Sequence, residues 1–469
     1  MNSTKICNKL FFLICFVISL SGYSQADQKL TRDIFKEMIE INTTNSTGST
    51  TKAAAAVAAR LKAAGFTDAD IFLGGAAENK GNIVARLKGS GKRKPLLLLA
   101  HLDVVEAPQV DWSTDPFKFE EIDGYYYARG SSDDKAMASI FVANMIRMKK
   151  EKFMPDRDII LALTADEEGG DHNGVDWLLK NHKDLIDAEY ALNEGGRGQE
   201  KEGKKILNQV QLSEKVFNSF TLEVVNKGGH SSQPRKDNAI YAMARALENL
   251  SNFDFPVNLN EGTRVYFERS SKIESGELAA DFAEMVKPNY NPEALKRLSA
   301  YPSYNALLRT TCVATMISGG HAENALPQNV TTNINCRILP GEDPEMIRQT
   351  LIKVIDNPIV TVTSKTVAKK SPPSGMNPDV FGSIEKVTQK MWPGVPVVPT
   401  MSTGATDGAY LRVAGIPTYG VSGIFADASD SRAHGKDERI GVKSYYDGQE
   451  FLYQLVKEMS QKTPIKRND

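Results

Sequence analysis

The chain has 469 residues, a length that favours two or three domains over a single core. Charged residues make up 25% of it, as in an ordinary soluble globular protein. The formal net charge of −1 excludes the strongly basic class, so we expect neither nucleic acid nor an anionic membrane as a partner.

Residues 1–26 have the pattern of a secretory signal peptide. Lys5 and Lys9 precede the apolar stretch Leu10–Leu20, and Ser24-Gln25-Ala26 supplies small residues for cleavage. The apolar stretch is short for a membrane span, and a retained anchor is the alternative. We therefore expect an exported, periplasmic or secreted protein whose mature chain has no stable membrane span.

Removal of the signal takes Cys7 and Cys15 with it and leaves Cys312 and Cys336 in the mature chain. Two cysteines do not make a disulfide framework. We therefore favour a pair of buried thiols over a disulfide, although the sequence alone leaves their pairing open.

The first part of the mature chain alternates helices and strands. We expect helices at Ala53–Ala64, Asp133–Lys150 and Gly174–Asn181, and strands at Gly81–Leu87, Lys94–Ala100, Asp158–Thr164 and Glu189–Leu192. The strands are short apolar runs, which are typical of a parallel sheet covered by helices on both faces. This pattern predicts an α/β catalytic domain with a mostly parallel sheet.

The order of elements changes from about Val216 onward. Expected strands at Phe217–Asn226, Thr310–Ser318, Val330–Ile338 and Ile359–Val367 alternate with expected helices at Asp237–Leu250 and Pro344–Asp356. The resulting βαββαβ order is that of the ferredoxin-like split unit. The stretch Asn252–Pro302, charged and containing proline, interrupts this order as a helical insertion.

A return to the first domain follows the linker Ser371–Gly375. The expected helices Pro378–Lys390 and Asp447–Met459 and the apolar run Pro396–Val398 belong to this return. We therefore predict a signal peptide (1–26), a catalytic domain in two parts (27–214 and 373–469) and an inserted ferredoxin-like α+β lid (215–372).

Histidine and carboxylate side chains follow the apolar runs of the first domain. His101 and Asp103 come after one strand, Glu167-Glu168 after the next, and Glu194 after a third. Ligands in open α/β sheets bind beyond the carboxyl ends of the strands. A mixed set of nitrogen and oxygen donors at that edge is suited to zinc. The sequence therefore predicts a metallohydrolase.

Each of these motifs also has a structural interpretation. A surface His-X-Asp pair would explain His101 and Asp103, and a solvated acidic loop would explain Glu167-Glu168. Asp133 follows Gly130 at an expected helix start, where an anion is favoured with or without a metal. In the functional interpretation, the Asp103 carboxylate accepts the second imidazole N–H of His101, and one of the two glutamates is a ligand while the other moves protons.

The order of these motifs resembles the M20 family of metallopeptidases from about Gly81 to Glu438. The resemblance rests on His101-Leu102-Asp103, Arg129-Gly130, Asp133-Asp134-Lys135, Glu167-Glu168-Gly169, Glu194, Gly228-Gly229-His230-Ser231, Gly319-Gly320, Asn324, Arg337 and His434-Gly435-Lys436-Asp437-Glu438. The stretches Ala306–Thr311 and Asn335–Gly341 are further similar to the branch with carboxypeptidase S and the N-acyl-amino-acid hydrolases.

The resemblance implies two zinc ions per subunit, with Co²⁺ or Mn²⁺ as substitutes, and assigns roles to the matching residues. Asp133 would bridge the metals, His101 and Glu194 would complete one site, and Glu168 and His434 the other. Glu167 would be the general base and Asp103 would orient His101. His230 would stabilise the oxyanion, and Asn324 and Arg337 would hold the substrate, with Arg337 on a free carboxylate.

Two positions test this transfer of roles. Ala136 stands where the family usually has glycine, and Glu194 stands where family dipeptidases and aminopeptidases tend to have aspartate. In the resemblance, glutamate at that position goes with carboxypeptidases and N-deacylases.

We therefore expect hydrolysis of a peptide or N-acyl amino acid next to a free carboxylate. A dipeptidase and a non-catalytic binding protein are the alternatives. Related lids often dimerise, and His230 can then serve the partner's site, whereas the insertion could replace that contact. The sequence leaves oligomeric state, side-chain preference and native metal open.

Overall fold

The computed structural model describes residues 26–365 and 370–461, so the predicted signal peptide lies almost wholly outside the described residues. The chain forms two compact units. The first comprises the chain up to Gln209, Pro378–Val397 and the chain from Gly420, and the second comprises Val210–Asn377 and Val398–Tyr419. Within the described ranges, no helix combines the length and the apolar character that a bilayer span needs.

The first unit is built around a sheet with a parallel centre. Strand β3 (Leu96–His101) lies between β6 (Ile159–Thr164) and β7 (Tyr190–Asn193) and runs parallel to both. All residues of these strands are buried, as the apolar runs predict. The predicted α/β class is confirmed.

One edge of this sheet is antiparallel. Strand β1 (Ile71–Gly75) pairs with β2 (Gly81–Leu87), and β2 pairs with β6, both in antiparallel register. The short connection between β1 and β2 allows a hairpin but not a crossover, which explains the change of direction.

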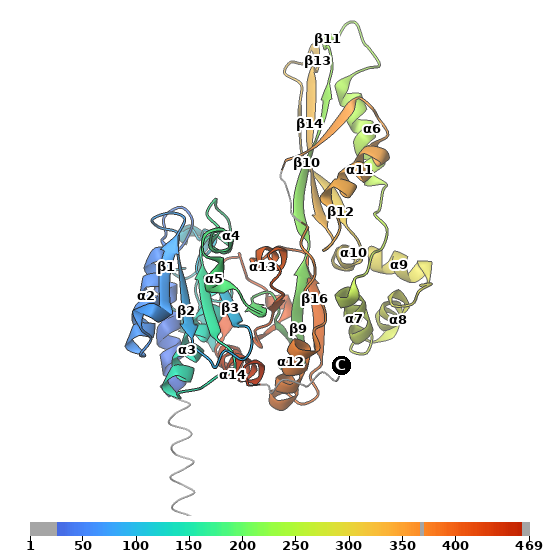
Figure 1. The fold of residues 1–469 in the computed structure, drawn as a ribbon. Coiled ribbons are helices and arrows are strands. Elements are labelled where there is room, and N and C mark those ends of the chain that lie inside the picture. Colours follow the sequence, from blue (N-terminus) through green and yellow to red (C-terminus); the bar gives the residue numbers. More distant parts are fainter. Residues whose placement is uncertain (1–25, 366–369, 462–469) are drawn as a thin grey trace, which may run out of the picture. The chain divides into compact units, whose positions relative to one another are not determined.

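Helices cover the strands of the first unit. Helices α2 (Thr50–Ala63) and α3 (Lys135–Lys150) pack on β2 and β3, and α14 (Val442–Met459) packs on α3 and on α12 (Pro378–Met391). The C-terminal helix α14 therefore lies beside α3, although the two are far apart in the sequence (Figure 1). Strand β9 (Lys204–Glu214) then carries the chain into the second unit.

The second unit contains the predicted βαββαβ order. Its strands β10 (Val216–Val225), β12 (Thr311–Gly319), β14 (Asn329–Ile338) and β15 (Val360–Ser364) form an antiparallel sheet in the order β12-β14-β10-β15. Helices α6 (Ala239–Ser251) and α11 (Pro344–Ile355) pack on this sheet. Alternate residues of β10 and β14, among them Leu222 and Ile334, form the core between the helices and the sheet.

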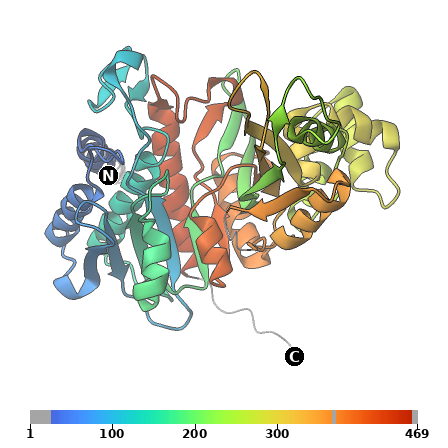
Figure 2. The same cartoon turned by 90° about the horizontal axis from the view of Figure 1, so that it is seen from above.

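The predicted helical insertion is also present. It consists of α7 (Glu261–Ser270), α8 (Gly276–Met285), α9 (Pro292–Ser299) and α10 (Pro302–Leu308). These helices have an apolar cluster that includes Phe267, Phe282 and Leu298, and they form a compact group, yellow in Figure 2.

Residues 398–419, which the sequence analysis assigned to the catalytic domain, belong to the second unit. Hydrogen bonds explain this placement: Lys215 N donates to Ser402 O at 3.0 Å, and Thr418 N donates to the Ser374 hydroxyl at 2.9 Å. The segment includes α13 (Gly408–Val413). Backbone bonds across a fold of this kind leave no signal in the hydrophobic pattern.

The expectation of free thiols is corrected by the structure, because Cys312 and Cys336 form a disulfide. The two residues lie directly opposite each other on β12 and β14, with their Cα atoms 4.1 Å apart. Only the strand register brings them together, and a sequence separation of 24 residues does not reveal that register.

Candidate metal centre

The strand order of the first unit brings the predicted ligands to one edge of its sheet. His101 is the last residue of β3, Glu194 directly follows β7, and Glu168 lies just beyond β6. Because β6, β3 and β7 are parallel neighbours, their carboxyl ends open on the same crevice.

Two groups of possible metal ligands meet at that edge and share Asp133. The first group is His101, Asp133 and Glu194, the second is Asp133, Glu168 and His434, and within each group the ligand atoms lie within 4.8 Å of one another. Asp133 Oδ1 is 3.1 Å from His101 Nε2, whereas Asp133 Oδ2 is 3.3 Å from His434 Nε2. The two oxygens of one carboxylate therefore face two different groups, and the structure brings all the predicted ligands together.

The charges of this cluster favour a cation. Burial opposes protonation of His101, but the hydrogen bond with Asp133 and the charge of Glu194 raise its pKa well above the usual value. Hydrogen bonds with Asp133 and Glu168 raise the pKa of His434 to about 10. Burial, together with the charge of Asp133, raises the pKa of Glu194 well above its usual value. In this cluster, bound protons offset negative charge that divalent cations could offset instead. Its nitrogen and oxygen donors also suit such ions.

Asp103 contacts its neighbours differently from the expectation. The ring Nδ1 of His101 lies 3.0 Å from the backbone oxygen of Asp103 and 3.7 Å from its carboxylate. The carboxylate instead accepts the backbone N–H groups of Glu167 and Glu168, at 3.2 and 3.0 Å. The expected hydrogen bond from the His101 ring to the Asp103 carboxylate is therefore corrected: β3 ends at His101, and beyond it the Asp103 carboxylate binds the backbone of the glutamates while its backbone oxygen faces the ring. Asp103 therefore supports both strand ends, through its carbonyl and its carboxylate.

The turn that carries Glu167 and Glu168 is also held from its other side. Asp166 has a left-handed backbone, with φ of 55°, and its buried carboxylate lies 2.5 Å from Lys80 Nζ. His172 N donates to the same carboxylate at 3.3 Å. Of the two adjacent glutamates, Glu168 belongs to one of the two candidate ligand groups found among the described residues, and Glu167 belongs to neither.

Asp133 precedes helix α3 and does not begin it, which corrects the expected start. The helix begins at Lys135 with Asp134 as its N-cap, and the Asp133-Asp134 peptide is cis. Asp133 is held by the loop before the helix, and a buried side chain accepts hydrogen bonds from the backbone N–H groups of that loop.

That acceptor is Glu438, a residue that the sequence analysis quoted within a motif but gave no role. Its carboxylate is fully buried and accepts the backbone N–H groups of Gly130, Ser132 and Asp133 at 3.0, 2.6 and 3.0 Å. It also pairs with Arg129 Nη1 at 2.7 Å. Glu438, which lies between His434 and β19 (Arg439–Gly441), thus fixes the loop that carries Asp133. The only sequence feature that pointed to a role for Glu438 was its position four residues after His434.

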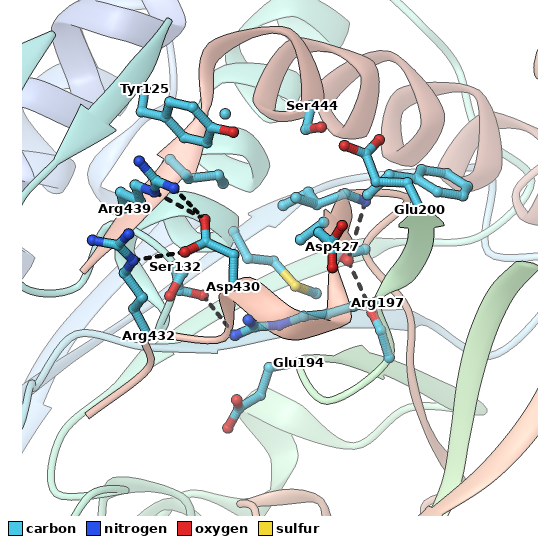
Figure 3. A pocket seen from close by; sticks show the side chains of 18 of the residues that line it. Tyr125, Ser132, Glu194, Arg197, Glu200, Asp427, Asp430, Arg432, Arg439 and Ser444 are labelled. Carbon is cyan, nitrogen blue, oxygen red and sulfur yellow. Dashed lines mark hydrogen bonds and ion pairs between the residues drawn. The ribbon is translucent and has the colours of Figure 1, made fainter. Parts of the chain in front are cut away.

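A cavity of about 340 Å³ in the first unit reaches the candidate metal ligand Glu194. Arg432 and Arg439 line it and both pair with Asp430, at 2.7 and 2.6 Å, while Arg197 Nη2 donates to Ser132 O at 3.2 Å. Figure 3 shows Arg432 and Arg439 around Asp430, and Arg197 between this group and Glu194. One candidate metal ligand therefore borders a cavity lined by charged side chains.

The second unit carries the remaining predicted residues and places two of them together. The short strands β11 (Gly229–His230) and β13 (Ala325–Leu326) pair with His230 opposite Ala325. Ser231 N donates to Asn324 O at 2.9 Å. His230 and Asn324 are both exposed, so they are neighbours on one surface of this unit.

Arg337 lies near the end of β14, in the four-stranded sheet of the same unit. It pairs with Phe217 at the start of β10, whereas His230 lies beyond the end of β10. The 10 residues of β10 span roughly 30 Å. The structure therefore separates Arg337 from His230 and Asn324, and one subunit cannot place all of them on a small substrate.

The local environment of Arg337 is compatible with binding an anion. Its guanidinium lies 4.9 Å from the ring centre of Phe217, and partial burial lowers its pKa. Among the described residues, no carboxylate pairs with Arg337 within 4.0 Å. The side chain therefore packs on an aromatic ring and retains its donors.

Two candidate ligand groups that share one carboxylate at the edge of a sheet are typical of metal-dependent hydrolases. A family model described as peptidase family M20/M25/M40 matches residues 97–458. The chain therefore belongs to this family, whose members hydrolyse peptide or amide bonds.

Named proteins agree with this assignment. The chain is 29% identical over 379 residues to "Probable carboxypeptidase S-like 2" of Dictyostelium discoideum, covering 78% of this chain and 71% of the relative. It is 26% identical over 378 residues to the human "N-fatty-acyl-amino acid synthase/hydrolase PM20D1", covering 77% and 74%. The M20 family metallo-carboxypeptidase Sso-CP2 from Sulfolobus solfataricus has a similar fold, with TM-score 0.67, 20% identity and coverage of 92% and 99%.

Proposed function

We propose that this protein is a two-zinc hydrolase that cleaves the peptide or amide bond next to a free carboxylate. It releases the carboxyl-terminal residue of a peptide or hydrolyses the amide bond of an N-acyl amino acid. The observation that carries the proposal is the division of the Asp133 oxygens between two ligand groups. Zinc bound there supplies a hydroxide near neutral pH and polarises the scissile carbonyl.

The side chains of the first unit divide into ligands and a base. His101 and Glu194 would hold one ion and Glu168 and His434 the other, with Asp133 common to both groups. Glu167 is the general base: it takes a proton from the attacking water and returns it to the leaving amine. Asp103 receives the backbone N–H groups of both glutamates, so it fixes the base relative to the ligand.

Arg337 supports the choice of a free carboxylate. A guanidinium binds a carboxylate through two parallel hydrogen bonds, and Arg337 has no carboxylate partner among the described residues. Relatives named as carboxypeptidase S-like and as an N-fatty-acyl-amino acid hydrolase both act, by their names, beside such a group. An unblocked dipeptide also carries a free carboxylate, so the substrate test includes it.

His230 and Arg337 lie too far apart in one copy to contact the same small substrate, but residues from two copies could do so. We propose that His230 and Asn324 of one copy serve the metal centre of the other. Strand β12 lies at the edge of its sheet and exposes Val313, Met316 and Ile317 by 57%, 69% and 65%. Residues 310–320 include no charged residue, and an exposed, uncharged edge invites pairing with another strand. Antiparallel pairing of two β12 edges is self-complementary, as a twofold dimer requires.

Mixing inactive variants tests this arrangement. In a mixed dimer of His230→Ala and Glu167→Gln chains, one site combines an intact Glu167 with the partner's intact His230. Activity that appears on mixing after separate purification supports two-copy sites. Activity that stays absent from a mixture with exchanged subunits contradicts them.

We also propose that the protein is exported and that a signal peptide ending near Ala26 is removed. Export fits the disulfide between Cys312 and Cys336, since disulfides persist in oxidising compartments. Amino-terminal sequencing of protein from a bacterial periplasmic fraction tests this, with a mature start near Asp27 expected. An intact Met1 in a membrane fraction would contradict it.

The substrate proposal is tested by matched acids and amides. We expect kcat/KM for N-acyl amino acids and N-blocked dipeptides to exceed that for their C-terminal amides by about 10- to 100-fold, the value of a charge-assisted hydrogen bond. Arg337→Lys should reduce this ratio, because an ammonium lacks the planar fork. Equal rates on acid and amide in the wild type would contradict the proposal, and faster turnover of free dipeptides would favour a dipeptidase.

A further inference from the structure

The backbone around His230 is fixed by its neighbours. His230 pairs with Ala325 across the β11–β13 ladder, and Gln233 N donates to His230 O at 3.0 Å. Gly228, with φ of 71°, has no room for a side chain, because an added Cβ would lie 2.8 Å from Gln328 Cγ and 3.1 Å from Leu326 O. The position of the Cα atom of His230 is therefore set by the hairpin and not by the imidazole.

The imidazole ring has its own contacts, and both come from Ser232. The backbone N–H of Ser232 donates to His230 Nδ1 at 3.2 Å, and the Ser232 hydroxyl lies 2.8 Å from the same nitrogen. A backbone amide can only donate, so Nδ1 has to be the acceptor and carries no hydrogen in this arrangement. In a neutral ring, the hydrogen is then on Nε2.

We propose that Ser232 is a positioning residue that sets the tautomer and ring orientation of His230, so that Nε2–H is the donor to the oxyanion. The inference rests on the oxyanion role proposed for His230. A ring of the other tautomer would present a bare nitrogen, which repels a developing negative charge instead of stabilising it. The hydroxyl also restricts rotation of an exposed side chain that would otherwise sample several rotamers.

Ser231 provides a matched control within the same turn. Its backbone N–H donates to Asn324 O at 2.9 Å, so its contact with the hairpin comes from the main chain. Ser231→Ala and Ser232→Ala each remove one hydroxyl from neighbouring exposed residues, but only Ser232→Ala removes a contact with the ring. Ser232→Thr keeps the hydroxyl and should behave as the wild type.

The test uses full-length, metal-loaded protein with ¹⁵N-labelled histidine at pH 8, compared as wild type, Ser232→Ala, Ser232→Thr and Ser231→Ala. Ring signals of His230 are identified by their loss in His230→Asn. We expect a hydrogen on Nε2 and a hydrogen-bonded, unprotonated Nδ1 in the wild type, Ser232→Thr and Ser231→Ala. Ser232→Ala keeps the backbone N–H donor to Nδ1 and loses only the hydroxyl. The hydrogen should therefore stay on Nε2 while the Nδ1 shift moves part of the way toward that of a free ring, and kcat should fall about 2- to 10-fold, the value of one neutral hydrogen bond, without change in KM or metal content.

A hydrogen on Nδ1 in the wild type, or identical ring spectra in the wild type and Ser232→Ala, would overturn the inference. These results do not depend on turnover. Failure of the oxyanion role itself would appear separately, as a normal kcat in His230→Ala with the expected tautomer still present. Adding Ser232→Ala to His230→Ala should lower kcat no further, because Ser232 acts through the ring.

Discussion

The metal centre of the first unit and the His230 hairpin of the second differ in how firmly their side chains are held. Glu438 is fully buried and receives several donors from the loop of Asp133. His230 is exposed and its ring has contacts only with Ser232 among the described residues. The difference indicates that the geometry of the candidate ligands is built before substrate binds, whereas the proposed oxyanion donor depends on a local hydrogen bond.

The largest expected effect separates the base from the ligand beside it. Glu167→Gln should lower kcat by about 10²- to 10⁴-fold, because the amide keeps the shape of the side chain but cannot accept the proton. Metal analysis of the same preparation should give the wild-type content. Glu168→Gln is the matched control and should lose metal. Metal loss in Glu167→Gln, or near-normal turnover, would reverse the roles of the two glutamates.

In the first unit, the parallel strands explain which parts of the candidate site could be predicted from the sequence. His101, Glu168 and Glu194 each follow an apolar run, and parallel runs end at one edge, so their meeting could be predicted. The roles of Glu438 and of the Asp103 carboxylate could not, because they depend on which backbone N–H groups a turn directs toward them. The helix start at Lys135 and not at Asp133 depends on the same loop.

In the second unit the order of elements was predictable but the register was not. The disulfide between Cys312 and Cys336 and the separation of Arg337 from His230 both follow from how β14 aligns with β12 and β10. Alternating polarity assigns residues to a face of a sheet and leaves their position along the strand undetermined. Sequence motifs therefore do not predict a site whose residues must lie at particular positions along neighbouring strands.

The second prediction concerns the exposed His230 of the second unit. His230→Ala should raise the barrier by about 3–4 kcal/mol, the cost of one lost oxyanion donor, while zinc affinity stays at the wild-type value. Steady-state kinetics and a competitive zinc titration on the same variant check both parts. A vacated metal site, or an unchanged kcat, would place His230 outside the oxyanion role.

The third prediction concerns the buried support of Asp133. Glu438→Gln presents an amide to N–H groups that need an acceptor, so it should weaken metal binding by about 10- to 100-fold, as loss of a supporting contact typically does. Asp437→Asn changes the neighbouring carboxylate, which binds Ser113, and should leave zinc affinity unchanged. Equal zinc affinities for wild type and Glu438→Gln would show that the loop needs no such support.

The last prediction concerns stability and compares two buried lysines. Lys80 pairs with Asp166 in the first unit, whereas Lys215 in the second donates to Arg309 O at 2.7 Å, and burial lowers the pKa of Lys215 to about 7. The unfolded chain therefore binds more protons at this lysine between pH 7 and about pH 10.

Wild-type stability should consequently gain on that of Lys215→Met as pH rises through this window, by at most about 1.4 kcal/mol per pH unit. Urea unfolding of both chains at pH 7 and pH 9.5 measures the gain. A difference in unfolding free energy that is the same at both pH values would show that Lys215 does not titrate there.

The central claim is that Asp133 belongs to both metal sites, and metal stoichiometry tests it most directly. Zinc titration of the apoprotein should give two ions per chain in the wild type and one tightly bound ion in either His101→Ala or His434→Ala. Asp133→Ala should weaken both sites, because each of its carboxylate oxygens faces a different ligand group. A single zinc per wild-type chain, or one site of undiminished affinity in Asp133→Ala, would contradict the account.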